Sequence, residues 1–224
     1  LFALHVEASG LFLCADSALQ PVVDRENELR FFNYDLLLGR VDETHPLFST
    51  FRKAGWSNAD FGWFRDHALA IDGFGVNYYP QLSVYRIQGD PSHPEFVGVY
   101  GGLEYLEKLL AQYQQRYGGP LFLTETSING PVEHQVCWWK ESTQFCQSLA
   151  KKGMDLRGYT WFPAMDLINW DYRTGNLPLE RYREPMGFIQ LSMDAGRQWA
   201  RRLSPLAEEM KRKLLPSGKG ERRR

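Results

Sequence analysis

Cysteine is scarce in this sequence, with only three among 224 residues. Cys14, Cys137 and Cys146 do not make a disulfide framework, and their spacing matches no metal-binding motif. We expect a cytoplasmic protein, because a reducing compartment is the simplest setting for so few cysteines.

Long apolar runs and a strong net charge are missing as well. No stretch approaches the roughly 20 apolar residues of a membrane span, and no signal peptide is visible. The formal net charge of −1 gives no indication of nucleic-acid binding. We therefore expect neither a membrane nor a nucleic acid as a partner. Because the sequence begins with Leu1, inside a strand-like stretch, we also expect it to be a fragment of a longer chain.

The residues that are abundant favour a globular protein rich in aromatic side chains. Hydrophobic residues make up 43% of the chain, which is enough to bury a sizeable core. Aromatic residues reach 14%, with seven Trp and eleven Tyr. Aromatic-rich clefts often hold sugars or bases, although Trp is equally a good core residue. The length suits one large domain or two small ones.

Strand-like and helix-like patterns alternate along the chain. Short apolar stretches predict strands at residues 1–8, 71–79, 120–125, 156–162 and 186–191. Apolar residues at helical spacing predict helices at residues 24–39, 45–55, 57–67, 102–117, 131–152 and 198–214. Residues 10–21 are expected to form a loop, residues 82–99 a hairpin, and residues 216–224 a charged, disordered tail.

This alternation implies parallel strands joined by right-handed crossovers. Two α/β architectures fit it, an open doubly wound sheet and part of a (β/α) barrel. No Gly-rich phosphate-binding motif follows any strand, which argues against a dinucleotide-binding fold. Polar residues stand at the ends of several strands, which favours the barrel. We expect a single domain over residues 1–215.

The stretch from Pro120 to Gly130 is the first candidate for a functional site. An apolar run at residues 121–123 is short enough for a buried strand, and it ends abruptly at Thr124 and Glu125. A carboxylate at the end of a buried strand is costly unless it is paired or used. In parallel α/β folds the chemistry lies at this end of the strands. Glu125 is therefore a candidate catalytic residue; the alternative is a Glu that caps the next helix or pairs with an Arg.

Three motifs stand in order along the chain: Asp-Gly-Phe-Gly-Val-Asn-Tyr-Tyr at 72–79, Leu-Thr-Glu-Thr at 123–126, and Gly-Tyr-Thr-Trp at 158–161, before a loop rich in Asp and Trp. Their order and rough spacing resemble glycoside hydrolase family 1, the β-glucosidase-like retaining enzymes. The resemblance spans residues 25–210 but covers only strands five to eight of that family's (β/α)8 barrel. It implies a partial TIM-type barrel.

The resemblance also assigns roles to single residues. Glu125 matches the family's nucleophile, and Tyr79 matches the tyrosine that hydrogen-bonds it. Trp161 matches the tryptophan beneath the bound sugar, and Trp170 matches a second one at the sugar's polar edge. Further substrate contacts are expected from Asn77, Asp166, Asn169 and Glu7. The alternative for each is an ordinary packing, loop or buried-pair role.

The chain departs from the family's pattern at several points. The family's Thr-Glu-Asn-Gly reads Thr-Glu-Thr-Ser at residues 124–127. The family places a Glu, which grips the sugar's outer hydroxyls, where this chain has Asn169. The loop between Trp161 and Trp170 looks one residue longer. The family's acid/base, a Glu in an Asn-Glu-Pro motif on strand four, has no counterpart in these 224 residues.

Retaining glycoside hydrolysis explains why these residue types matter. It uses two carboxyl groups about 5–5.5 Å apart. One attacks the anomeric carbon, and the other protonates the leaving oxygen and later activates water. A hydroxyl donated by Tyr79 would favour the ionised form of Glu125. A flat Trp face suits the C–H surface of a pyranose.

The sequence therefore predicts a retaining glycosidase that acts on carbohydrate without a metal or an organic cofactor. Because no acid/base is found, we expect the fragment alone to be inactive or very weak. The open edges of a half barrel would favour self-association. Two alternatives remain: a non-catalytic carbohydrate-binding barrel protein, and an open α/β enzyme that acts on a different substrate.

Overall fold

A computed structural model of the chain describes residues 3–5, 10–194, 196 and 198–214. Glu7 and the predicted tail at residues 216–224 lie outside the described residues. The chain divides into two compact units. Unit 1 comprises Leu1–Thr126 and Phe145–Thr160, and unit 2 comprises Ser127–Gln144 and Trp161–Arg224. The single domain predicted over residues 1–215 stays a prediction. No described helix combines the length and the apolar character that crossing a membrane requires.

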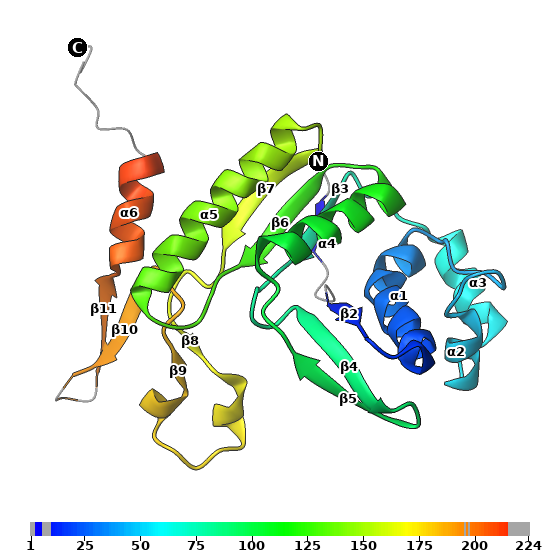
Figure 1. The fold of residues 1–224 in the computed structure, drawn as a ribbon, viewed down its shortest axis with the longest axis horizontal. Helices are drawn as coiled ribbons and strands as arrows, with labels where there is room; N and C mark the ends of the chain where they lie inside the picture. The colour runs from blue at the N-terminus through cyan, green and yellow to red at the C-terminus, as the bar shows by residue number, and fades with distance from the viewer. Residues whose placement is uncertain (1–2, 6–9, 195, 197, 215–224) are drawn as a thin grey trace. The chain divides into compact units, whose positions relative to one another are not determined.

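Unit 1 is built on a four-stranded sheet (Figure 1). Its strands lie in the order β1 (Ala3–His5), β3 (Gly73–Asn77), β6 (Leu121–Thr126) and β7 (Leu156–Trp161). β1 is parallel to β3, and β3 is parallel to β6. The spatial order follows the chain order and never reverses. A doubly wound sheet reverses its strand order at a switch point, and no such reversal occurs among these four strands.

Helices α1 (Gln20–Leu37) and α4 (Gly102–Tyr117) cover one face of this sheet (Figure 1). The Tyr34 hydroxyl on α1 donates to the Gly75 carbonyl at 2.8 Å. The Tyr117 ring on α4 stacks on Phe74, with ring centroids 4.6 Å apart. Apolar side chains of β3 and β6 are buried on this face: Phe74, Val76, Leu121 and Leu123. The predicted strand at 71–79 and helix at 102–117 are thereby confirmed.

Two shorter helices, α2 (Phe48–Lys53) and α3 (Asn58–Asp66), pack against α1. Their shared core consists of Phe32, Leu36, Val41, Leu47 and Phe61. α3 begins with a capping box, in which the Ser57 side chain accepts from the Asp60 backbone and the Asp60 side chain accepts from the Ser57 backbone. This pattern was readable in the sequence, and the helix start predicted at residue 57 is confirmed.

A second, smaller sheet of unit 1 contains β2 (Leu11–Leu13), β4 (Val84–Asp90) and β5 (His93–Gly98). The hairpin predicted at residues 82–99 is confirmed. The loop predicted at residues 10–21 is wrong, because β2, a 3₁₀ turn (η1, Ser17–Leu19) and the start of α1 lie there. Distant partners fix β2: it pairs in parallel with β4, and the Phe12 backbone N–H donates to the Asn27 side chain at 3.0 Å.

Helix α5 (Val132–Lys151) follows β6 and contributes residues to both units. The rest of unit 2 consists of short elements. They are β8 (Leu167–Ile168), η2 (Trp170–Arg173), η3 (Leu179–Tyr182), β9 (Arg183–Glu184), β10 (Ile189–Met193), β11 (Trp199–Leu203) and α6 (Pro205–Leu214). β8 pairs antiparallel with β9, and β10 pairs antiparallel with β11.

The terminal helix predicted over residues 198–214 is wrong in its first third, where β11 lies. The helix begins only at Pro205, whose ring suits the first helical position because no backbone N–H is needed there. The Ser204 hydroxyl accepts from the Ala207 backbone at 3.2 Å and caps this start. The strand predicted at residues 186–191 lies slightly later, at β10.

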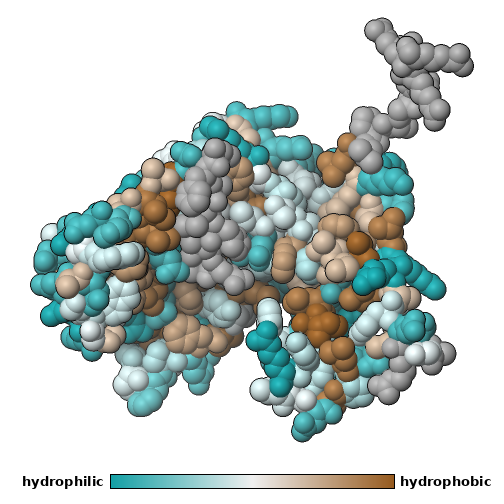
Figure 2. Space-filling model, turned by 180° about the vertical axis from the view of Figure 1, so that it is seen from behind, coloured by the Kyte–Doolittle hydropathy of each residue, from teal (hydrophilic) through white to brown (hydrophobic). Residues whose placement is uncertain are grey.

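Apolar side chains also reach the surface of the molecule. On the face shown in Figure 2 they form separate patches among hydrophilic residues. The large apolar residues with more than half of their surface exposed are Trp63, Leu82, Tyr100, Trp170, Leu177, Leu203 and Leu214. Single exposed apolar residues are normal in proteins. Only Trp170 among them belongs to the residues that the sequence predicts to contact a sugar.

Candidate active site

Glu125 lies at the carboxyl end of β6, where a β-bulge determines its direction. Val76 pairs with Leu123, but Asn77 pairs with Glu125, so Thr124 is the extra residue on β6. Side chains of directly paired residues point to the same side of a sheet. The bulge therefore turns Glu125 to the side that Asn77 faces, whereas strict alternation would have placed it with the buried Leu123. Bulges of this kind are frequent next to active sites.

Tyr79 meets Glu125 at this end of the sheet. Its hydroxyl donates to Glu125 Oε2 at 2.6 Å, and both residues are half-buried. A phenol hydroxyl this close to a carboxylate makes a short, charge-assisted hydrogen bond, which holds the carboxylate in one rotamer. The pairing of Tyr79 with Glu125, expected from the sequence, is therefore present in the structure.

The backbone around Tyr79 is held by several hydrogen bonds. The Tyr79 N–H donates to Ser83 Oγ at 2.9 Å, and the Tyr79 carbonyl accepts from Leu82 and Ser83 at 3.0 and 2.9 Å. The neighbouring Tyr78 is fully buried, and its hydroxyl donates to the Gly102 carbonyl at 2.7 Å. Burial raises the Tyr78 pKa well above its ordinary value, so this side chain stays neutral. Tyr78 thus anchors the turn that presents Tyr79.

Asn77 lies beside Glu125 and is 4% exposed. Its Oδ1 accepts a hydrogen bond from Thr124 Oγ1 at 2.9 Å. This hydrogen bond fixes the position of the Asn77 amide oxygen, so the amide nitrogen, which is the donor, lies on the opposite side of the amide. The bulge residue Thr124 thereby orients Asn77 as well as displacing Glu125.

Glycines on the neighbouring strands make room for Phe122, which precedes the bulge on β6. A Cβ at Gly73 would lie 2.7 Å from the Phe122 ring, and one at Gly158 would lie 2.5 Å from it. Any side chain at either position would displace the ring. The sheet can therefore hold the large Phe122 ring on β6 only because the neighbouring residues, Gly73 on β3 and Gly158 on β7, lack side chains.

Unit 2 carries four further predicted residues, and two of them are buried. Trp161 is 7% exposed, and its indole N–H donates to the Met186 carbonyl at 2.9 Å. The Asp166 carboxylate is completely buried. It accepts from Arg183 Nη1 at 2.8 Å and from the backbone of Leu191 and Gly187 at 2.9 and 3.1 Å.

The sugar contact expected from Asp166 stays a prediction. In this structure the buried carboxylate is satisfied by three donors of the protein itself. Arg183 also donates to the Leu191 carbonyl at 2.8 Å. Asp166 and Arg183 together tie β9 to β10, which is a structural role.

Asn169 and Trp170 follow β8, at the start of η2. Asn169 Oδ1 accepts from the Asp171 backbone at 2.9 Å, and Asn169 Nδ2 donates to Glu184 Oε1 at 2.5 Å. Trp170 is 63% exposed, and the Arg173 guanidinium lies 4.5 Å from its ring centroid. Glu184 was not predicted as a site residue, because nothing near residue 184 in the sequence links it to Asn169. Glu7, also predicted to line the site, lies outside the described residues.

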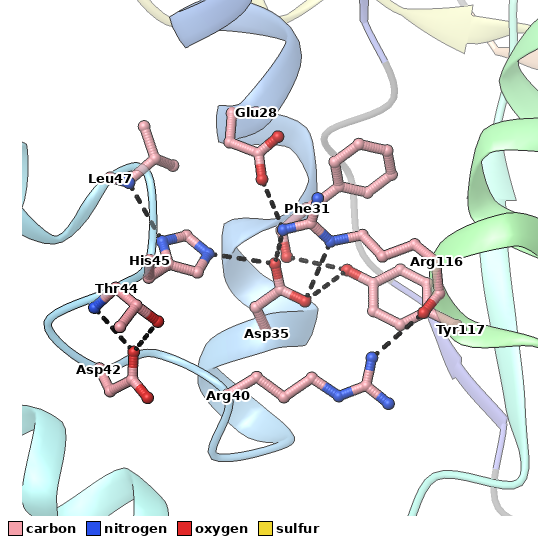
Figure 3. A network of polar contacts seen from close by, with 10 residues as sticks. All are labelled: Glu28, Phe31, Asp35, Arg40, Asp42, Thr44, His45, Leu47, Arg116 and Tyr117. Carbon is pink, nitrogen blue, oxygen red and sulfur yellow. Dashed lines mark hydrogen bonds and ion pairs between the residues drawn. The ribbon is translucent and has the colours of Figure 1, made fainter.

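One group of side chains in the described part of the chain has the donor atoms of a metal site: Glu28, Asp35 and His45. Figure 3 shows that the Arg116 side chain extends from α4 into this group. Arg116 Nη2 lies 2.5 Å from both Glu28 Oε1 and Asp35 Oδ2. The guanidinium already supplies the positive charge that both carboxylates require, so the group is better described as an ion-pair network.

The same network joins α1 to α4 through Asp35. His45 Nδ1 accepts from the Leu47 backbone at 3.1 Å, which leaves His45 Nε2 facing Asp35 Oδ2 at 3.3 Å. Burial acts to raise the Asp35 pKa, but hydrogen bonds from His45 and Arg116 outweigh it and hold the pKa below its ordinary value. Asp35 is therefore an ionised, buried and fully paired carboxylate with a structural role.

The chain matches known proteins in structure and not in overall sequence. No protein-family model matches the sequence, and no curated protein matches it. Solved structures do match. They include a family 1 β-glucosidase from Thermotoga maritima in complex with isofagomine lactam, at a TM-score of 0.71 and 16% identity over 94% of this chain and 50% of that one. The same enzyme in complex with glucoimidazole matches at a TM-score of 0.70 and 15% identity, over 94% of this chain and 50% of that one.

A GH1 β-glucosidase from Exiguobacterium antarcticum matches at a TM-score of 0.69 and 14% identity, over 95% of this chain and 50% of that one. The chain thus spans about half the length of the structures it matches. At these identities the likeness concerns the fold. The fold of this chain is similar to that of part of the GH1 β-glucosidases, as the sequence motifs predicted.

Proposed function

We propose that this chain is part of a retaining β-glycosidase in which Glu125 is the nucleophile. The observation that carries the proposal is the 2.6 Å hydrogen bond from the Tyr79 hydroxyl to Glu125 Oε2, at the carboxyl ends of two adjacent parallel strands. It gives a half-buried carboxylate a donor that fixes its direction. The similar fold of GH1 β-glucosidases supports the same assignment.

The proposed chemistry follows from that geometry. An oxygen of Glu125 attacks the anomeric carbon while the bond from that carbon to the leaving oxygen breaks, which gives a glycosyl ester on Glu125. Tyr79 keeps the carboxylate aligned for the attack. A second carboxyl group, about 5–5.5 Å from the first, protonates the leaving oxygen and then takes a proton from the water that hydrolyses the ester.

We also propose that the four strands of the unit 1 sheet are successive strands of a (β/α)8 barrel. Their unreversed order supports this, and so do matching structures of twice the length. The second carboxyl group would then come from outside these 224 residues, which contain no Asn-Glu-Pro motif. On this view the chain alone turns over ordinary glycosides poorly, and the open strand edges favour self-association.

The proposed substrate is an O-glycoside of a neutral pyranose. The matching Thermotoga maritima structures contain sugar mimics such as glucoimidazole and galacto-hydroximolactam. We assign sugar contacts to Asn77, Trp161, Asn169 and Trp170. The missing acid/base motif favours one second candidate, a non-catalytic carbohydrate-binding protein that keeps these contacts without turnover.

The test is covalent trapping with 2-deoxy-2-fluoro glycosides that carry a dinitrophenolate leaving group. This group departs with its electron pair and without acid assistance, so the first step needs only the nucleophile. Intact mass is measured for the wild type, for Glu125→Gln, and for Glu133→Gln as a control at an exposed Glu. We expect one added sugar in the wild type and the control, and none in Glu125→Gln. A folded wild-type chain that gains no sugar from any glycoside, or equal labelling of Glu125→Gln, would contradict the proposal.

A further inference from the structure

The ribbon formed by β8 and β9 in unit 2 brings together two side chains that are far apart in the sequence. Leu167 pairs with Glu184 and Ile168 with Arg183. The next residue, Asn169, continues the ribbon because its backbone N–H donates to the Tyr182 carbonyl at 2.8 Å. The Asn169 side chain then reaches Glu184 Oε1 at 2.5 Å. Asn169 directly precedes the exposed Trp170 in the sequence.

The hydrogen bonds of Asn169 determine which end of its amide faces Glu184. The Asp171 backbone N–H is a donor, so the atom it meets at 2.9 Å must be the Asn169 oxygen. Asn169 Nδ2 therefore points at Glu184, and a donor meets a carboxylate. A Glu at position 169 would instead place two carboxylates side by side, which repel each other. The Asn169 amide therefore supplies the donor that the Glu184 carboxylate accepts from, which a carboxylate at position 169 could not do.

Glu184 keeps hydrogen-bonding capacity after this contact. A carboxylate offers about four acceptor sites. Among the described residues, Asn169 is the one hydrogen-bonding partner of the Glu184 carboxylate, through Oε1, and the side chain is partly exposed. The adjacent Arg183 does not neutralise it, because that guanidinium is engaged by Asp166 and by the Leu191 carbonyl. Glu184 is therefore an oriented, partly exposed acceptor that carries its own negative charge.

We propose that Glu184, positioned by Asn169, is a specificity-determining residue that accepts hydrogen bonds from hydroxyl groups of the bound sugar. The inference rests on the proposed glycosidase function, which supplies the neutral, hydroxyl-rich ligand. A carboxylate accepts from two neighbouring hydroxyls at once, and a hydrogen bond to a charged group is stronger than one between neutral groups. The exposed indole of Trp170 follows on the same loop and offers an apolar surface for the C–H face of a pyranose.

The test measures binding of glucoimidazole and its monodeoxy counterparts to the 224-residue chain by isothermal titration. The variants are Glu184→Gln, which removes the charge at constant size, and Asn169→Asp, which keeps the cap on Asp171 but removes the donor to Glu184. Glu208→Gln, at an exposed Glu of α6 in the same unit, is the control. Circular dichroism confirms that each variant is folded.

We expect Glu184→Gln to weaken glucoimidazole binding by about 10- to 100-fold, and Asn169→Asp to weaken it as well. The loss in Glu184→Gln should vanish for the deoxy compounds that lack the bound hydroxyls, and Glu208→Gln should bind like the wild type. Affinities unchanged in Glu184→Gln, or reduced equally for every deoxy compound, would overturn the proposal. If the wild type is labelled at Glu125 in the trapping experiment, such a result overturns the role of Glu184 alone. If the wild type neither binds glucoimidazole nor is labelled at Glu125, both the role of Glu184 and the proposed glycosidase function are wrong.

Discussion

Removing the Tyr79 hydroxyl perturbs the proposed active site with little change elsewhere. Tyr79→Phe deletes the 2.6 Å hydrogen bond to Glu125 and keeps the ring. A hydrogen bond to a charged group contributes about 1.5–3 kcal/mol. If that contribution serves to align the attacking carboxylate, its loss slows attack by about 10- to 150-fold. The backbone bonds that hold residue 79 do not involve the hydroxyl, so we expect the fold to persist.

The assay follows the appearance of the glycosyl adduct by intact mass over time, with the dinitrophenyl 2-fluoro glycoside in excess. Tyr85→Phe is the matched control, because Tyr85 lies in the same unit and stacks on Phe12, 5.5 Å between ring centroids. The control should be labelled at the wild-type rate. A folded Tyr79→Phe chain that is labelled as fast as the wild type would refute the reasoning, since the hydrogen bond would then contribute nothing to attack.

Three further predictions concern stability. Asp35→Asn removes one partner of a buried ion pair, and we expect the free energy of unfolding in urea at pH 7 to fall by about 3–5 kcal/mol. Partners in the folded state lower the Asp35 pKa. The stability that Asp35 contributes is therefore present above the unfolded pKa, about 3.9, and is lost as the pH falls through the lower folded pKa. If the wild type stays more stable than Asp35→Asn by the same amount below both pKa values, this reasoning is wrong. Gly158→Ala would place a Cβ 2.5 Å from the Phe122 ring, so the melting temperature should fall, by the equivalent of about 1–3 kcal/mol, and Phe122→Leu in the same chain should recover part of it. Asn169→Asp and Glu184→Gln should each destabilise the chain to urea, whereas the double variant restores a donor and an acceptor with reversed polarity; a coupling energy near zero in this double-mutant cycle would argue against the pair.

Long periodic segments and strong local signals were predictable from the sequence. The helix over α4 was predicted with its bounds, because an apolar stripe runs through it and glycines stand at both ends. The start of α3 followed from Ser57 and Asp60, whose side chains reach their partners within the same turn. The pairing of Tyr79 with Glu125 was expected from the resemblance to glycoside hydrolase family 1, and the 2.6 Å hydrogen bond between them agrees with it.

Features that depend on residues distant in the sequence could not be predicted from the sequence. β2 is only three residues long, and its hydrogen bonds go to β4 and to Asn27. β11 resembled the start of a helix until its pairing with β10 was known, although Ser204 and Pro205 were a readable signal for the true helix start. Glu184 lies 15 residues from Asn169, and only the pairing of β8 with β9 brings them together. The bulge at Thr124 is likewise a property of register between strands rather than of local sequence.

The most direct test of the central claim is to find which side chain carries the trapped sugar. The labelled chain is digested, and the modified peptide is fragmented and read by tandem mass spectrometry. We expect one fluorosugar on Glu125, in the peptide that contains Thr124 and Thr126. A sugar on any other carboxylate, or a chain that stays folded and unmodified with every glycoside, would contradict it.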